Sequence, residues 1–254
     1  MTLIFIHILP VLITGFAAVV HGAVGIGFPL IATPLLAMVT DVKTAILLLV
    51  VPTIAINIAN IIKGGEWQKS IALYWPLAVY GMIGSFLGAR LLVAVPPENF
   101  RPVLAGVIFL YLNADRLGVG FSWVPRYPKT AAALFGLAAG ILGGTVNVML
   151  PALVIFALEI RMDKTAMIQV FNFCFLFGKL TQGLVFVQAG FLTPDVIKTS
   201  IPLAVLSLVV MVSAMTLRTR IRGDVYKRWL RRLLLIMAVV LLSQFFYGMV
   251  VKTV

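Results

Sequence analysis

Long apolar blocks fill the chain from end to end, and short polar or charged stretches separate them. A helix needs about 20 residues to cross the hydrocarbon core of a bilayer, so we interpret these blocks as membrane helices. We expect the sixth and seventh blocks to be too short to cross upright as separate helices, and the first two to be a full span with a short partner. The pattern predicts ten helical segments, at about residues 3–22, 25–39, 45–62, 71–94, 101–114, 130–143, 147–160, 165–187, 196–217 and 230–251.

Two stretches rich in glycine and proline interrupt this pattern, HGAVGIGFPLIATP (His21–Pro34) and AGILGGTVNVMLP (Ala139–Pro151). An offset of 117 superposes Gly27 on Gly144, together with the prolines that end the two stretches. Glycine and proline break helices, and a break in hydrocarbon is tolerated only where protein covers it or where it lines a cavity. Two related breaks, one in each half of a chain, are typical of a transporter's binding site.

The repeat continues beyond these stretches. Gly65 corresponds to Gly190, and Pro76 corresponds to Pro202 at an offset of 126. The sequence therefore predicts an N-terminal transmembrane repeat (1–114), a connecting loop (115–129) and a C-terminal transmembrane repeat (130–254).

The distribution of positive charge predicts the orientation. An odd number of crossings in each half inverts the second half and leaves Lys179 in the membrane, with fourteen of the other basic residues on one side. The opposite side then carries five, namely Lys43, Arg90, Arg101, Lys198 and Lys252. An even number would divide the same residues 12 to 7. Cytoplasmic loops are rich in Lys and Arg, so we expect both termini outside. Five spans in each half, or a re-entrant pair followed by three spans, satisfy this parity equally.

Composition supports an all-α integral membrane protein, because 62% of the residues are hydrophobic and only 11% are charged, against about 25% charged in soluble domains. The net charge of +12 follows from the basic loops rather than from nucleic-acid binding. The run Arg218–Arg232 is interpreted as a cytoplasmic loop with a topological role, with contact to anionic lipid as a secondary effect.

Several kinds of chemistry are disfavoured. The chain has one cysteine, Cys174, which we expect in the core, and two histidines, so a disulfide and a Cys/His metal cluster are excluded. We expect no cofactor and no enzymatic activity, since the sequence lacks the Gly-Lys-Ser/Thr phosphate loop of an ATPase. No acidic residue lies deep in a predicted span, which argues against a carboxylate proton relay.

Two helices carry polar stripes. At about 100° per residue, the polar residues of 45–62 fall within about 60° of one another, and those of 165–187 form a similar stripe. Such residues either hydrogen-bond between helices, each stabilising by about 0.6 kcal/mol, or face a shared binding site. The stripes are Thr53, Asn57 and Asn60 on the first helix, and Gln169, Asn172, Lys179 and Gln182 on the second.

Lys179 gives the predicted site a positive charge. A cation at membrane depth costs at least ~2.5 kcal/mol, so it needs an anionic partner, a watery cavity or loss of its charge; the alternative is that it extends to the outer interface. A helix restarting after Gly27 or Gly144 would direct free N–H groups toward mid-membrane. Pro29 suits the first turn of one such helix, and Thr145 or Asn147 could cap the other.

These elements together predict an oxyanion site near the midplane. The candidate substrate-binding residues are Gly25, Gly27, Gly143, Gly144, Thr145, Asn147, Asn57, Asn60, Asn172, Lys179 and Gln182. Elsewhere, Gly81, Gly84 and Gly88 have the spacing of a close helix contact. Arg90 is interpreted as an interface anchor or as an outer gate for anions.

The chain resembles the sulfite exporter TauE/SafE family (TSUP permeases) over nearly its whole length. The similarity lies in GIGFPLIATPLL (Gly25–Leu36), GGTVNVMLPALV (Gly143–Val154), a Lys-Thr-Ala triplet at Lys43 and another at Lys164, and Gly84 with the Gly-Ala-Arg run that follows it. Family members usually have a denser Gly-x-Gly-Gly-Gly run in each motif, and this chain departs from it.

The resemblance implies a secondary transporter, an exporter in several members, for small sulfur-containing anions such as sulfite or organosulfonates. We expect alternating access around the midplane site, in the cell membrane, with a proton or another ion as a possible coupling partner. An anion channel and an uptake permease for other small organic anions are the alternatives. An intramembrane enzyme is disfavoured, since no catalytic His/Asp/Glu or Cys/His constellation lies at membrane depth.

Overall fold

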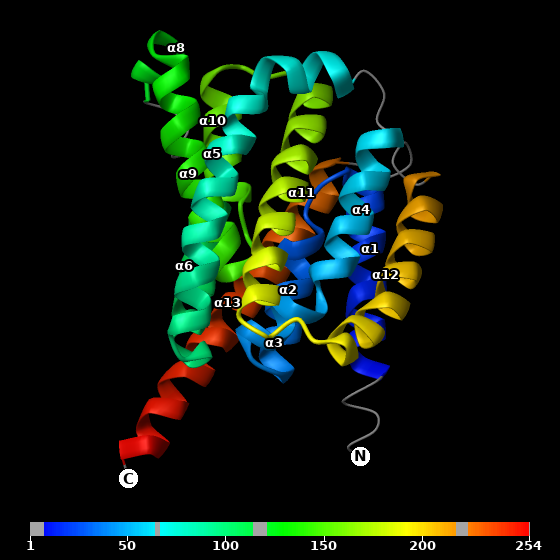
Figure 1. Ribbon diagram of the computed structural model, residues 1–254, viewed down its shortest axis with the longest axis vertical. Coiled ribbons are helices and arrows are strands. Elements are labelled where there is room, and N and C mark those ends of the chain that lie inside the picture. The colour runs from blue at the N-terminus through cyan, green and yellow to red at the C-terminus, as the bar shows by residue number, and fades with distance from the viewer. Residues whose placement is uncertain (1–7, 64–66, 114–120, 217–222, 254) are drawn as a thin grey trace.

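The computed structural model describes residues 8–63, 67–113, 121–216 and 223–253, and this part of the chain contains helices and no strand (Figure 1). The α-helices are α1 (Leu9–Val24), α2 (Phe28–Val39), α3 (Val42–Leu48), α4 (Val50–Lys63), α5 (Trp67–Ala94), α6 (Phe100–Leu112), α8 (Trp123–Arg126), α9 (Pro128–Val146), α10 (Leu150–Glu159), α11 (Lys164–Gln188), α12 (Pro194–Ala214) and α13 (Gly223–Thr253). A short 3-10 helix, η2 (Pro97–Asn99), precedes α6.

The helix lengths confirm a multi-pass membrane protein. Within the described residues, five helices are long and apolar enough to cross a membrane, and α3 with α4 makes a sixth if this pair, bent by 49°, is one span. One expectation was wrong: α9 has 19 residues and is long enough to cross, because its helix continues three residues past the predicted end. α10, with 10 residues, is short as expected.

Two other predictions differ from the structure in where helices begin. The basic run Arg218–Arg232 is not wholly a loop, because α13 begins at Gly223. The connection 115–129 contains the short helix α8 and the first residues of α9. Residues 1–7, 64–66, 114–120, 217–222 and 254 lie outside the described part of the chain, so the start of the first segment and the match of Gly65 to Gly190 are not tested there.

α1 and α2 are separated by a sharp change of direction. Gly25, with φ of 96°, ends α1, and Gly27, with φ of 106°, precedes α2; glycine adopts this left-handed backbone without steric cost. α1 rises from the end of the molecule that carries the N-terminus, and α2 returns toward that end, where α3 lies (Figure 1).

α9 and α10 make a second turn of this kind. α10 returns along α9, because Glu159 at its last residue accepts a hydrogen bond from the Phe121 amide, which lies before the start of α9 (3.2 Å). The side chains of Phe135 on α9 and Phe156 on α10 also pack together, with ring centroids 6.0 Å apart.

The closest helix contact joins α5 to α9, and glycine makes it possible. A Cβ on Gly84 would lie within 3.0 Å of the Leu137 carbonyl and the Ile141 amide, and a Cβ on Gly140 would lie equally close to the Gly81 carbonyl. The expected close contact is therefore confirmed at Gly84 and Gly88, whereas a Cβ on Gly81 would meet only ordinary contacts at 3.8 Å. α9 contributes the glycines of the opposing surface.

α11 runs through the middle of the bundle and packs against α4, α5 and α9 (Figure 1). Asp163 caps its first turn by accepting from the Thr165 and Ala166 amides. Cys174 on this helix is buried, as expected. Arg90, in contrast, is exposed and lies over the Phe86 ring at 5.2 Å, which favours its role as an interface anchor.

The α5–α9 contact yields a test. We expect Gly84→Ala to lower the free energy of unfolding by about 1–3 kcal/mol, because the added methyl overpacks a backbone contact. Gly106→Ala is the matched control, since a Cβ there meets nothing within 4 Å. Thermal unfolding in detergent measures both variants, and equal melting temperatures would contradict the proposed basis of this contact.

Candidate anion-binding site

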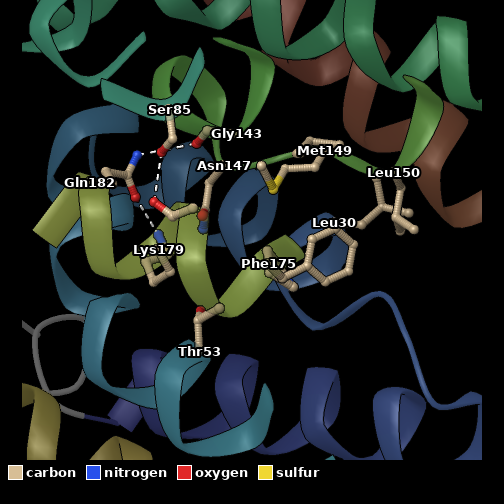
Figure 2. A pocket seen from close by; sticks show the side chains of 13 residues that line it. Leu30, Thr53, Ser85, Gly143, Asn147, Met149, Leu150, Phe175, Lys179 and Gln182 are labelled. Atoms are coloured by element: carbon tan, nitrogen blue, oxygen red, sulfur yellow. Dashed lines mark hydrogen bonds between the residues drawn. The ribbon is translucent and has the colours of Figure 1, made fainter. Parts of the chain in front are cut away.

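A small cavity lies where six helices and the α9–α10 turn meet, and its volume is about 20 Å³. Its position follows from the two sharp turns, because the first residues of α2 and of α10 both border it. The residues that line it are Pro29, Leu30, Thr53, Ser85, Gly143, Asn147, Val148, Met149, Leu150, Phe175, Gly178, Lys179 and Gln182 (Figure 2).

Lys179 supplies the charge of this cavity. Its side chain is only 4% exposed, so it does not extend to the membrane interface. The ammonium donates a hydrogen bond to Gln182 Oε1 at 2.5 Å, and Figure 2 shows the two side chains turned toward each other. Among the described residues, no carboxylate lies within salt-bridge distance of Lys179.

Gln182 connects this ammonium to the end of α9. Its Nε2 donates to the carbonyls of Gly144 (2.8 Å) and Gly143 (3.2 Å). Gln182 therefore supplies donors to two backbone acceptors and one acceptor to Lys179. All of these partners are neutral, so the positive charge has no counterion in the described structure.

Apolar side chains form much of the remaining wall, chiefly Leu30, Met149, Leu150 and Phe175. An unpaired charge in such surroundings is costly, and electrostatic attraction is stronger there than in water. The site thus combines a single cation with an apolar wall.

The first turns of two helices also border the cavity. α2 presents Pro29 and Leu30, with Pro29 in the first turn as predicted. α10 begins at Leu150 and presents Met149 and Leu150. Helix N-termini carry partial positive charge and N–H groups without an intrahelical partner, which reinforces the charge of Lys179.

In the second half, the helix restarts later than predicted. Gly143, Gly144 and Thr145 belong to the last turn of α9, where amides are committed to intrahelical bonds, so they cannot supply the free N–H groups assigned to them. Thr145 Oγ1 bonds the Ile141 carbonyl at 2.7 Å. Asn147 Nδ2 donates to Thr33 Oγ1 at 2.8 Å, so neither of the expected side chains caps α10.

The backbone conformations favour a different sequence offset between the two predicted repeats. Residues 122 positions apart share conformations and roles: Gly25 and Asn147 end their helices with positive φ, Pro29 and Pro151 lie in first turns, and Asp41 and Asp163 are N-caps. The offset of 117 matched glycine with glycine, whereas in the second half Asn147 takes the left-handed position. Asparagine also adopts this conformation more readily than other side chains.

The polar stripes divide between two places. Asn60 and Asn172 both donate to the Gly25 carbonyl, at 2.5 and 3.0 Å, and therefore satisfy the backbone at the end of α1. Thr53 lines the cavity, and its buried Oγ1 has no hydrogen-bond partner among the described residues. Asn57, one turn further along α4, is fully buried, and neither atom of its amide has such a partner there.

Of the predicted binding residues, the structure brings four to the cavity: Gly143, Asn147, Lys179 and Gln182. The others, Gly25, Gly27, Gly144, Thr145, Asn57, Asn60 and Asn172, do not line it. Sequence reasoning missed Ser85, whose Oγ donates to the Gly178 carbonyl at 2.6 Å. A serine within the glycine-spaced run of α5 was the available signal. Among the described residues there is no group of three His, Cys, Asp or Glu that could hold a metal.

The apolar helices and their buried polar interior define a multi-pass helical membrane protein. The chain belongs to the sulfite exporter TauE/SafE family, whose family profile matches residues 11–244. This is a family of membrane transporters for sulfite and related sulfur anions. Neither a curated protein nor a solved structure matches the chain.

The unpartnered hydroxyl of Thr53 leads to a prediction about stability. A buried polar group without a partner costs about 1–3 kcal/mol, so Thr53→Val should leave the melting temperature unchanged or raise it. Ser85→Ala removes a made hydrogen bond and should lower the free energy of unfolding by about 1 kcal/mol. Thermal unfolding of the two variants side by side measures the contrast. A loss of stability in Thr53→Val equal to that in Ser85→Ala would show that Thr53 has a structural role.

Proposed function

We propose that this protein is a secondary transporter that exports a small sulfur-containing anion, such as sulfite or an organosulfonate, across the cell membrane. The observation that carries the proposal is Lys179, a buried ammonium with neutral partners that faces a cavity bordered by two helix N-termini. Membership of the TauE/SafE family supplies the class of substrate.

The electrostatics of the cavity favour an anion over a cation or a neutral ligand. Lys179 is the only charged side chain among the cavity-lining residues, and the first turns of α2 and α10 add positive potential. An anion placed there supplies the missing counterion. Thr53 Oγ1 is a donor without a partner among the described residues, so it can donate to an oxyanion.

The size of the cavity favours a carrier. A volume of about 20 Å³ is close to what one water molecule requires, so an oxyanion with several heavy atoms needs the surrounding helices to move apart. Such movement is the essence of alternating access. A continuously open pore would instead show a connected aqueous path.

The fold is further proposed to consist of two inverted repeats. The 122-residue correspondence of helix ends and caps supports this, as do Pro76 and Pro202, which lie inside α5 and α12 at an offset of 126. The first residues of α1 and the last residues of α13 lie at one end of the molecule, and α8 lies at the opposite end (Figure 1). With the basic loops in the cytoplasm, both termini face outward.

A panel of ligands tests the class of substrate. Purified protein in detergent is heated with sulfite, sulfate, thiosulfate, sulfoacetate, taurine or acetate. A ligand that binds the native state raises the melting temperature according to its affinity. Stabilisation by sulfur oxyanions supports the proposal, and stabilisation by acetate alone would favour an uptake permease for organic anions. In liposomes, saturable exchange of labelled sulfite identifies a carrier, and ohmic current identifies a channel.

Lys179→Met gives the sharpest prediction, since methionine keeps an unbranched side chain and removes the charge. We expect the apparent Kd for the stabilising anion to rise about tenfold to a hundredfold, as for a lost charge-assisted hydrogen bond of about 1.5–3 kcal/mol. Exchange of the anion in liposomes should fall in parallel. The fold should survive, because the substitution removes a buried charge.

Lys198→Met is the matched control, because Lys198 is exposed beside Asp195 at the start of α12. It should bind and transport as the parent does. Unchanged affinity in Lys179→Met, with both variants folded, would exclude Lys179 from the binding site.

A further inference from the structure

His21 is a fully buried titratable group to which the proposed transport function gives no role. It lies in the last turn of α1, four residues before Gly25. Its Nδ1 accepts a hydrogen bond from the backbone N–H of Phe28, the first residue of α2, at 3.1 Å. The imidazole therefore links the two sides of the α1–α2 turn.

The hydrogen-bond network fixes which form of His21 fits this turn. A nitrogen that accepts a bond carries no proton, so with Nδ1 accepting, the neutral imidazole has its proton on Nε2. Nε2 faces the Asn60 amide nitrogen at 3.0 Å, and that amide also donates to the Gly25 carbonyl. With the neutral ring, the His21 Nε2–H and the Asn60 NH2 group therefore face each other as two hydrogen-bond donors. Rotating the amide by 180° replaces it with a contact between two acceptors at Gly25.

Protonation adds a second conflict. The imidazolium has a proton on each nitrogen, so Nδ1 would oppose the Phe28 N–H in addition to the mismatch at Asn60. Neutral His21 thus stabilises the closed turn, and protonated His21 destabilises it.

The group that protonation would release is the Phe28 N–H, and Phe28 directly precedes two residues that line the anion site. Phe28 is followed by Pro29 and Leu30, and both line the cavity. When Phe28 loses its bond to His21, the α2 N-terminus gains a free N–H and the turn gains a positive charge. Both changes favour an anion in the cavity.

We propose that His21 binds a proton that is coupled to the transported anion: protonation of His21 releases the first turn of α2 and promotes binding of the anion beside Lys179. The coupling to transport rests on the proposed function, whereas the proton-dependent opening of the turn does not. The residue 122 positions later is Gly143, so the proton site belongs to the first turn alone.

The charged groups around His21 are few. α2 has no charged residue, and α1 itself has none besides His21. The other helices that pack against α1 and α2, or reach the turn through Asn60 and Asn172, carry charge at their ends or at Lys179. Among the side chains that the structure describes, these charged residues are Lys43 on α3, Lys63 on α4, Arg101 on α6, Lys164 and Lys179 on α11, Asp195 and Lys198 on α12, and Arg228, Arg231 and Arg232 on α13.

Cysteine labelling tests the opening without any substrate. Cys174 is the sole cysteine, so Cys174→Ala with Ile26→Cys places one reporter thiol within the turn. The same background with His21→Asn retains an acceptor for the Phe28 N–H, because Asn Oδ1 replaces Nδ1, and it cannot titrate near neutral pH. Dividing the maleimide labelling rates of the two proteins at each pH removes the intrinsic pH dependence of the thiol.

We expect this ratio to rise about fivefold as the pH falls across the range in which histidine protonates, which corresponds to the loss of one hydrogen bond of about 1 kcal/mol. His7→Asn, a substitution of the other histidine, should label as the parent does. A ratio that stays constant with pH, in proteins of equal thermal stability, would overturn the proposal.

Proton movement in liposomes tests the coupling. Methanesulfonate, the anion of a strong acid, carries no proton itself, so a gradient of labelled methanesulfonate should drive proton movement, reported by enclosed pyranine, only through the protein. His21→Asn should take up methanesulfonate more slowly and with little proton movement, and His7→Asn should retain both the uptake and the proton movement.

The labelling experiment and the liposome experiment distinguish failure of the His21 proposal from failure of the proposed function. Net uptake of methanesulfonate without proton movement in the parent protein would overturn the coupling at His21. If the parent exchanged none of the sulfur anions tested, the proposed function would fail, while the labelling ratio would still decide whether His21 controls the turn.

Discussion

The structure depends on one constraint, which is that backbone groups freed at a helix turn in hydrocarbon must find partners. Carboxamide side chains from neighbouring helices meet it at both turns. Asn60 on α4 donates to the Gly25 carbonyl at the end of α1, and Gln182 on α11 donates to the last carbonyls of α9. Asn60 and Gln182 are 122 residues apart, the same offset that relates the two turns. Carboxamides of the two polar stripes therefore satisfy the backbone at the two helix turns, and they do so from corresponding positions in the chain.

This constraint also explains why Lys179 has no charged partner and is available for the proposed anion. Because both amide hydrogens of Gln182 are used on backbone carbonyls, only its oxygen is available to the ammonium. The remaining lining residues are apolar or carry neutral polar side chains, as Thr53, Ser85 and Asn147 do. A cation held by one neutral oxygen is adequately fixed in position but not neutralised, and this combination suits a group that must bind an anion and then release it.

Patterns that are local in sequence predicted much of the fold. Apolar block length located the helices, glycine spacing predicted the close contact of α5, and the isolated Lys179 marked the site. The predictions that failed concern features that depend on backbone conformation or on residues distant in the sequence. Asn147 takes the left-handed position that Gly25 takes in the first half, so matching residue types misplaced the restart of α10. Asn60 and Asn172 meet at one carbonyl because two helices pack there, and no spacing within either helix reveals this.

Helix packing also indicates which parts would move in the proposed alternating access, and these are not the two sequence halves. The most extensive contact joins α5 of the first half to α9 of the second, through glycines that allow backbone to touch backbone. On the other side of α11, α1 and α4 of the first half pack against α12 of the second (Figure 1). Each group therefore contains helices from both halves. Because the glycine contacts between α5 and α9 bring backbone against backbone, we expect these two helices to move together. The cavity lies between this pair and α4, with α11 and the first turns of α2 and α10 around it, so the proposed alternating access would change access to Lys179 by a shift of the two mixed groups against each other.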